Sequence, residues 1–71
     1  MSIPIGANIR ALRRKKGMTQ RQVAYYLHVS VQAVSKWERG QAYPDLVLLL
    51  PLADLFCVSL DELFGREYLA K

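Results

Sequence analysis

Apolar residues recur along most of the chain at the three- and four-residue spacing of an amphipathic α-helix, with polar residues between them. In the first such stretch, Ile5, Ile9 and Leu12 share one side while basic residues occupy the others. The pattern predicts a helix over residues 4–16 that ends at Gly17, because glycine readily adopts the left-handed backbone common at helix ends.

Two further helices are predicted where a capping residue precedes an apolar pattern. Thr19 followed three residues later by Gln22 is typical of a capping box, which predicts a helix over residues 20–27. After a short break, Ser30 is the next capping candidate, for a helix over residues 31–39. The inner sides of these helices would carry Val23, Ala24 and Leu27 on the first and Val34 and Trp37 on the second.

The last third of the chain predicts two more helices. Asp45 can cap the first of them, and Pro51 would mark the start of its regular part after a loose first turn. Ser59 and Glu62 form a second capping box before a short final helix. No stretch has the strict alternation of a β-strand, so the pattern predicts an all-α fold of five helices. The expected core positions here are Leu46, Leu49, Leu50, Ala53 and Phe56 in the fourth helix and Leu60, Leu63 and Phe64 in the fifth.

The length of 71 residues fits one domain, which we assign to residues 1–66, with a short C-terminal tail over residues 67–71. The net charge of +4 is unevenly distributed, because most acidic residues come late in the chain. This asymmetry suits a surface that faces a polyanion, although a solvated basic helix end would have the same composition. The early basic residues are Arg10, Arg13, Arg14, Lys15 and Lys16.

Several kinds of chemistry are excluded by what the sequence lacks. Cys57 is the only cysteine and His28 the only histidine, so we expect no internal disulfide, no metal site and no other cofactor. Cys57 has apolar neighbours and is expected to be a buried structural residue. No nucleophile with a base, paired carboxylates or glycine-rich phosphate loop is present, so we expect no catalytic residues and no enzyme activity.

The sequence also indicates where the protein acts. Its N-terminal residues lack the layout of a signal peptide, and the longest apolar stretch, residues 46–53, is too short to span a bilayer. A single cysteine agrees with a reducing compartment. We therefore expect a cytoplasmic protein without a membrane partner.

The most specific signal lies in the second and third predicted helices. Residues 18–24 read MTQRQVA, residues 29–30 read VS, and residues 34–40 read VSKWERG, with a proline at position 44. Together with residues 52–53, 58–59 and 61–63, they resemble the Cro and phage-repressor family of helix-turn-helix regulators, also called the xenobiotic-response-element family. The resemblance covers roughly residues 9–64. It implies a five-helix lambda-repressor-like domain that binds double-stranded DNA as a transcriptional regulator, more specifically a repressor.

The resemblance also assigns roles to individual residues. In the family, the third helix enters the major groove and the second lies across the DNA backbone. Gln20 would brace the third helix, and Arg13 and Glu38 would form an ion pair between the first and third helices. His28 departs from the usual glycine or asparagine, but histidine tolerates a left-handed backbone better than most residues. By position, the base contacts would be Val31, Gln32, Ser35 and Lys36, and the phosphate contacts Gln20, Ser30, Arg39, Gln41 and Tyr43.

Two partner hypotheses remain open beside the DNA operator. Members of the family bind symmetric operators as dimers, and Phe64, Tyr68 and Leu69 extend an apolar strip that is either a frayed tail or a homodimer contact. A protein partner, as for an antitoxin, is the alternative to operator binding, and the two roles can coexist. The polar residues on the third helix favour DNA over a protein partner.

Overall fold

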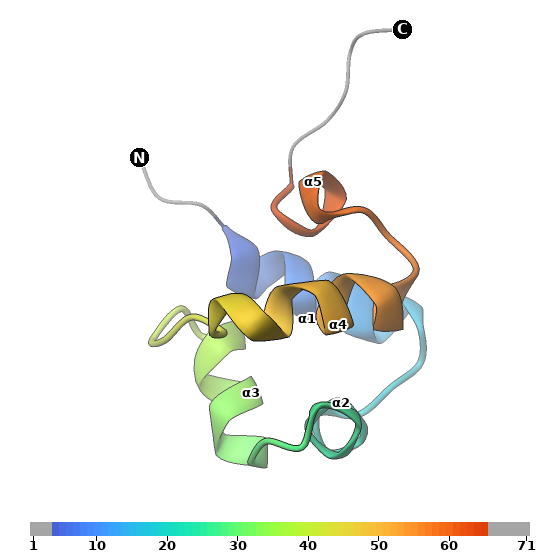
Figure 1. Cartoon of the computed structure of the whole chain (residues 1–71). Coiled ribbons are helices and arrows are strands. Elements are labelled where there is room, and N and C mark those ends of the chain that lie inside the picture. Colours follow the sequence, from blue (N-terminus) through green and yellow to red (C-terminus); the bar gives the residue numbers. More distant parts are fainter. Residues whose placement is uncertain (1–3, 66–71) are drawn as a thin grey trace, which may run out of the picture.

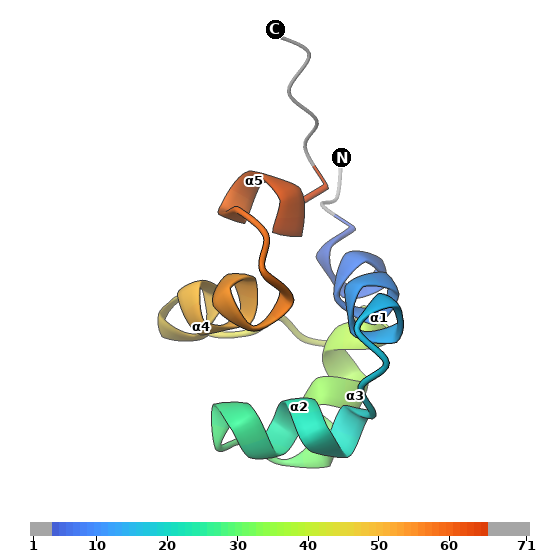
Figure 2. The same cartoon turned by 90° about the vertical axis from the view of Figure 1, so that its right-hand side faces the viewer.

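The computed structural model describes residues 4–65, and within this range the chain forms five α-helices and no β-strand. Figures 1 and 2 show α1 and α4 in the middle of the molecule, with α2 and α3 on one side of them and α5 on the other. The predicted all-α fold of five helices is confirmed. The helices are α1 (Ile5–Lys15), α2 (Gln20–Leu27), α3 (Val31–Glu38), α4 (Leu46–Phe56) and α5 (Leu60–Leu63).

The two predicted capping boxes are both present. The Thr19 hydroxyl accepts a hydrogen bond from the backbone N–H of Gln22 at 3.0 Å, and the Gln22 side chain accepts one from the Thr19 N–H at 2.8 Å. Ser59 and Glu62 form the same reciprocal pair at the start of α5. These bonds satisfy donors that a helix leaves free in its first turn, and each cap contributes about 1 kcal/mol.

The core takes one fully buried large side chain from every helix. Burying one such side chain contributes about 1.5–3 kcal/mol to the free energy of folding, so every helix helps to stabilise the common core. Trp37 is also buried, as its spacing from Val34 predicts. The Asn8 side chain adds a polar link between the ends of the chain, because it donates to the Leu63 carbonyl at 3.1 Å. The five fully buried side chains are Ile9, Val23, Val34, Leu52 and Leu63.

At Gly6, helix α1 comes very close to the C-terminal end of α3. A Cβ atom added at this position would overlap the backbone carbonyl oxygen of Trp37. Glycine inside a helix costs roughly 0.5–1 kcal/mol relative to alanine, because it loses more backbone freedom on folding. The approach of α1 to α3 therefore depends on a residue without a side chain.

The start of α4 differs from the prediction. The helix is continuous from Leu46 through Pro51, so the prediction that its regular part begins at Pro51 is wrong. Proline removes one helical hydrogen bond, to the carbonyl of Val47, and the exposed setting of Val47 lets water replace it. Asp45 stands at the cap position, but its side chain makes no capping bond. The Leu48 N–H donates to the Asp45 backbone carbonyl at 2.8 Å.

The buried face of α4 also differs from the prediction. Leu46 and Leu50 are 82% and 62% exposed, so their predicted core positions are wrong. Leu52, absent from the predicted core, is fully buried beside Ala53 and Phe56. The reason is that residues 46–53 have no polar member, so the pattern offers no polar side from which an inner face could be identified.

Two core predictions near the end of the chain also fail. Leu60 is 40% exposed, whereas Leu63 on the same short helix is fully buried. Cys57 is exposed, not buried, and its Sγ lies 3.6 Å from the Lys16 Nζ. It ends α4 with a left-handed φ of 59°, which turns its side chain away from the faces that its apolar neighbours share.

We expect Gly6→Ala to lower the free energy of unfolding by about 1–3 kcal/mol, because the added methyl group must push α1 away from α3. Helix propensity alone would raise the free energy of unfolding by roughly 0.5–1 kcal/mol. The sign of the measured change therefore shows which of the two effects is larger. Urea unfolding followed by circular dichroism gives the value, with Ala11→Gly on the exposed side of α1 as the propensity control. An unchanged or raised stability of Gly6→Ala would contradict the close contact.

Candidate nucleic-acid interface

A turn of three residues, from His28 to Ser30, joins α2 to α3. His28 has the left-handed backbone predicted for this position, with a φ of 60°. Ser30 then starts α3 by accepting a hydrogen bond from the Ala33 N–H at 3.1 Å, and Val29 packs against the core between the two. Two helices around such a short turn define a helix-turn-helix.

Helix α3 is held by its inner side and presents the other side to solvent. Val34 and Trp37 are 0% and 5% exposed and fix the inner side against the core. A helix held in this way can offer its outer side to a groove without losing its own contacts. The predicted base contacts all belong to this helix; Gln32 and Lys36 are exposed, and Val31 and Ser35 are half-buried.

The predicted phosphate contacts lie around this helix. Ser30 stands at its N-terminus and Gln20 begins the neighbouring α2. Arg39, Gln41 and Tyr43 follow its C-terminus in the loop to α4, and all three are exposed. The structure thus brings the two predicted sets of residues into one region, on α3 and at the helix ends next to it.

The charges of this region have one sign at the surface. From Met1 to Pro44 the only acidic residue is Glu38, whose side chain is 3% exposed and paired with Arg13. From α2 to the residue that follows α3, the exposed charged residues are all cations: Arg21, Lys36 and Arg39. Arg21 is not among the predicted site residues. Its exposure follows from which side of α2 packs on the core. Such a surface attracts a phosphate backbone.

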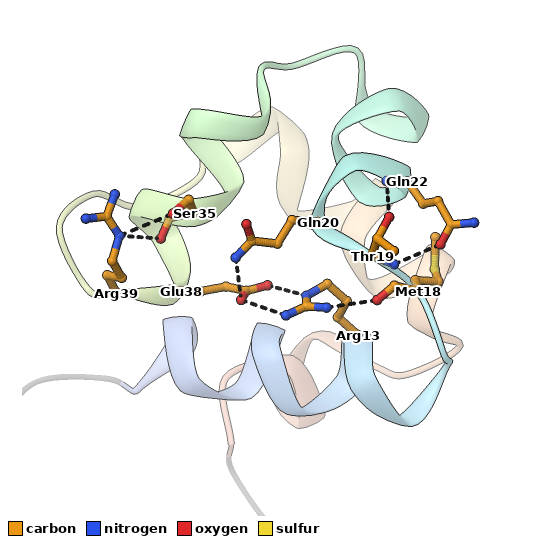
Figure 3. A network of polar contacts seen from close by, with 8 residues as sticks. All are labelled: Arg13, Met18, Thr19, Gln20, Gln22, Ser35, Glu38 and Arg39. Carbon is orange, nitrogen blue, oxygen red and sulfur yellow. Dashed lines mark hydrogen bonds and ion pairs between the residues drawn. The ribbon is translucent and has the colours of Figure 1, made fainter.

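A polar network joins the first three helices (Figure 3). Arg13 of α1 donates to both carboxylate oxygens of Glu38 on α3, from Nε at 2.6 Å and from Nη2 at 3.1 Å. Gln20 of α2 donates to Glu38 Oε1 at 3.0 Å, and Arg13 Nη1 donates to the Met18 carbonyl at 2.8 Å. A two-pronged arginine–carboxylate pair is strong and directional, so it fixes how α1 and α3 meet.

Both members of the ion pair are stabilised in their charged forms. Burial acts to raise the pKa of Glu38, but hydrogen bonds from Arg13 and Gln20, with the charges of Arg13 and Arg10, lower it by more. The pKa of Glu38 therefore lies below its ordinary value. The hydrogen bond to Glu38 raises the pKa of Arg13, and the negative charge of Glu38 adds to this, while burial opposes it.

Neither a metal-binding cluster nor a membrane-spanning helix is found among the described residues. Within residues 4–65, histidine, cysteine, aspartate and glutamate side chains do not gather in groups of three or more that could bind a metal ion. None of the helices in this range combines the length and apolar composition needed to cross a membrane. The candidate site described above therefore rests on the exposed side chains of α3 and of the residues next to it.

The predicted dimer contact is only partly covered by the described residues. Phe64 is half-buried and packs against the core. Tyr68 and Leu69, like the rest of the predicted tail, lie outside the described residues.

Comparison with known proteins agrees with the helix-turn-helix and identifies its family. A helix-turn-helix family profile matches residues 9–63. The chain is 43% identical over 61 residues to the HTH-type transcriptional activator BcrR of Enterococcus faecalis, which covers 86% of the chain and 30% of BcrR. It is 34% identical over 67 residues to the HTH-type transcriptional regulator ImmR of Bacillus subtilis (strain 168), which covers 94% of the chain and 53% of ImmR. The chain belongs to the helix-turn-helix family of the Cro and phage-repressor type, and it spans only part of the length of these two relatives.

Solved structures extend this similarity to the fold. The structure of the P22 c2 repressor protein, determined in complex with the synthetic operator 9T, superposes on this chain with a TM-score of 0.83 and 32% sequence identity. The match covers 93% of this chain and 100% of the P22 c2 chain. The restriction-modification controller protein C.AhdI from Aeromonas hydrophila is 33% identical, with a TM-score of 0.77. This match covers 86% of the present chain and 92% of the C.AhdI chain. The predicted five-helix, lambda-repressor-like fold is therefore confirmed.

We expect Arg13→Ala to lower the free energy of unfolding by roughly 3–5 kcal/mol, because it leaves the Glu38 carboxylate buried without its cation. Arg14→Ala removes the same charge from an exposed position on α1 and should change stability by less than about 0.5 kcal/mol. Urea unfolding of both variants beside the wild type measures the difference. Equal stabilities of the two variants would mean that the pair gives no net stabilisation.

Proposed function

We propose that this chain is a transcriptional regulator, not an enzyme, and that it represses transcription by binding a short, partly palindromic operator in double-stranded DNA. The observation that carries the proposal is the anchored α3, whose outer side bears hydrogen-bonding groups and a cation. The similarity to the P22 c2 repressor, whose structure was determined with a synthetic operator, supports it.

The outer side chains of α3 suit the edges of bases in the major groove. Gln32 can pair through two hydrogen bonds with adenine, and Lys36 can donate to the O6 and N7 acceptors of guanine. Val31 offers an apolar contact for the methyl group of thymine. Because each side chain prefers different base edges, their fixed order along α3 would determine the sequence that the protein prefers.

The residues around α3 would fix its position on the DNA. Arg39, Gln41 and Tyr43 are exposed in the loop after α3 and can contact phosphates, as can the backbone amides at the Ser30 cap. Such contacts do not depend on sequence, but they set the register in which the α3 side chains meet the bases.

Gln20 has a double role in this proposal. Its side-chain amide donates one hydrogen bond to Glu38, and its second amide hydrogen remains for a phosphate. The first turn of α2 adds unpaired backbone N–H groups and the positive end of a helix dipole. A phosphate bound there would link the docking of α2 on the backbone to the orientation of α3 through Glu38.

We infer that the operator-bound form is a dimer of two copies of this chain, joined through the first half of α4. Tyr43, Leu46, Val47 and Leu50 are 63%, 82%, 78% and 62% exposed, and none of them is charged. In a two-fold contact each residue near the axis meets its own copy, so uncharged side chains there avoid the repulsion that two like charges would have. This surface also begins in the loop after α3, which keeps the two groove helices near the axis.

Selection from a random pool of double-stranded DNA is the first test. We expect a two-fold symmetric motif, and we expect Gln32→Ala and Lys36→Ala each to lose roughly 1–3 kcal/mol of binding free energy and to relax the preference at one base position. Titrations at two salt concentrations separate this base-specific binding from phosphate binding, because phosphate contacts weaken as the salt concentration rises.

Arg14→Ala is the matched control for Lys36→Ala, because it removes an exposed cation from α1. Its effect should be the same on all sequences. If Lys36→Ala and Gln32→Ala also weakened every sequence equally, α3 would not be the helix that recognises bases. Salt-sensitive binding without an enriched motif would overturn sequence-specific regulation altogether.

Leu50→Glu should convert the dimer to a monomer, since it brings two carboxylates together across the proposed axis. Sedimentation of the chain at tens of micromolar, with and without enriched DNA, measures the association state. Tyr25→Glu introduces the same charge at an 83% exposed position on α2 and should leave the free dimer intact. A wild-type chain that stays monomeric on its operator, or a dimer unaffected by Leu50→Glu, would contradict this contact.

A further inference from the structure

Arg39 contacts one of the side chains assigned to base recognition. Its Nε lies 3.2 Å from the Ser35 Oγ and 3.3 Å from the Ser35 backbone carbonyl, so that one N–H is shared between two acceptors. The two residues are four apart, which brings side chains together on a helix surface. Arg39 is exposed and Ser35 is half-buried, so the contact lies at the rim of the surface assigned to DNA.

The contact determines what the Ser35 hydroxyl can still do. A serine hydroxyl has one hydrogen to donate and two lone pairs to accept. The guanidinium of Arg39 takes up a lone pair, and within residues 4–65 the hydroxyl hydrogen is donated to no acceptor, not even to the carbonyl four residues earlier that helical serines often use. The hydrogen is therefore left for a group outside the chain.

The rest of the Arg39 guanidinium is left for DNA as well. Its two terminal nitrogens make no hydrogen bond within the described part of the chain, and Figure 3 shows them pointing away from α3. They can bind a phosphate as charged donors while Nε keeps its contact with Ser35. One side chain can thus serve the backbone of DNA and a base-reading residue at the same time.

We propose that Arg39 is a specificity-determining positioning residue, which orients the Ser35 hydroxyl so that it donates to a base edge. This inference rests on the proposed operator binding. Purine N7, guanine O6 and thymine O4 can accept such a hydrogen bond, whereas cytosine offers only the N4 amino donor in the major groove. Because Arg39 already occupies one of the two Oγ lone pairs, the hydroxyl meets a base chiefly as a donor, and a base with an acceptor should be preferred over cytosine at this position.

A purely structural role of Arg39 makes a different prediction. A cation at the end of α3 that contacts the Ser35 carbonyl stabilises the helix end, and a phosphate contact strengthens binding to any sequence. Both effects change the affinity for all DNA by the same factor. Only an effect transmitted through Ser35 changes the ratio of affinities for two sites that differ at one base pair.

Three substitutions separate the donor at Nε from the charge of the guanidinium. Glutamine has its amide nitrogen, and lysine and methionine have a carbon, at the side-chain position that Nε occupies in arginine. Arg39→Gln keeps the donor and loses the charge, Arg39→Lys keeps the charge and loses the donor, and Arg39→Met loses both. Ser35→Ala removes the hydroxyl and identifies the base pair that it contacts.

The experiment measures affinities of the full chain and these variants for the selected site and for copies changed at each base pair. We expect Ser35→Ala to reduce discrimination against cytosine at one base pair by roughly three- to tenfold, the size of one hydrogen bond. Arg39→Lys and Arg39→Met should reduce it equally at that base pair. Arg39→Gln should keep the discrimination while its affinity falls for every site.

Each other outcome has a defined meaning. Because discrimination is a ratio measured on one protein sample, a smaller folded fraction cancels out of it. If Arg39→Gln and Arg39→Lys have the same discrimination, or if Ser35→Ala changes no base pair, the inference is wrong while operator binding stands. If the wild type itself prefers no sequence, the proposed function fails first, and this result is distinguishable from the other two.

Discussion

One buried carboxylate organises the part of the molecule that would meet DNA. Glu38 is 3% exposed and would be costly to bury without partners, so Arg13 from α1 and Gln20 from α2 must both reach it. The position of each of the first three helices is therefore tied to one side chain. The same arrangement removes the only negative charge before Pro44 from the surface, and it leaves the outer side of the helix-turn-helix positive.

Most of the fold could be predicted from short-range signals. Thr19, Ser30 and Ser59 cap helices whose starts depend on local hydrogen bonds, so the sequence predicts these starts correctly. The inner face of α4 could not be predicted, because residues 46–53 are apolar on every side and only the other helices decide which of them are covered. Gly6 did carry a signal, since a glycine inside a helical pattern suggests close packing, but its partner Trp37 is distant in sequence.

The candidate site could be predicted by position but not by contact. The resemblance assigned residues to α3 and its ends, and the structure brings them into one region. No sequence pattern indicates which acceptors a long, flexible side chain will bind. Arg39 stands four residues after Ser35, which permits a contact, yet a flexible arginine could equally have left Ser35 and extended into water. Such choices depend on the folded surroundings.

The core with one fully buried side chain from each helix has a consequence for how the molecule opens. Every helix contributes to one buried core, and no helix can detach without exposing apolar surface that its neighbours cover, so unfolding is expected to be a single cooperative transition. A ligand that binds only the native helix-turn-helix then stabilises α5 on the opposite side of the molecule as well. Folding and operator binding are thus thermodynamically coupled. A substitution far from the DNA can weaken binding because it reduces the population of the folded chain.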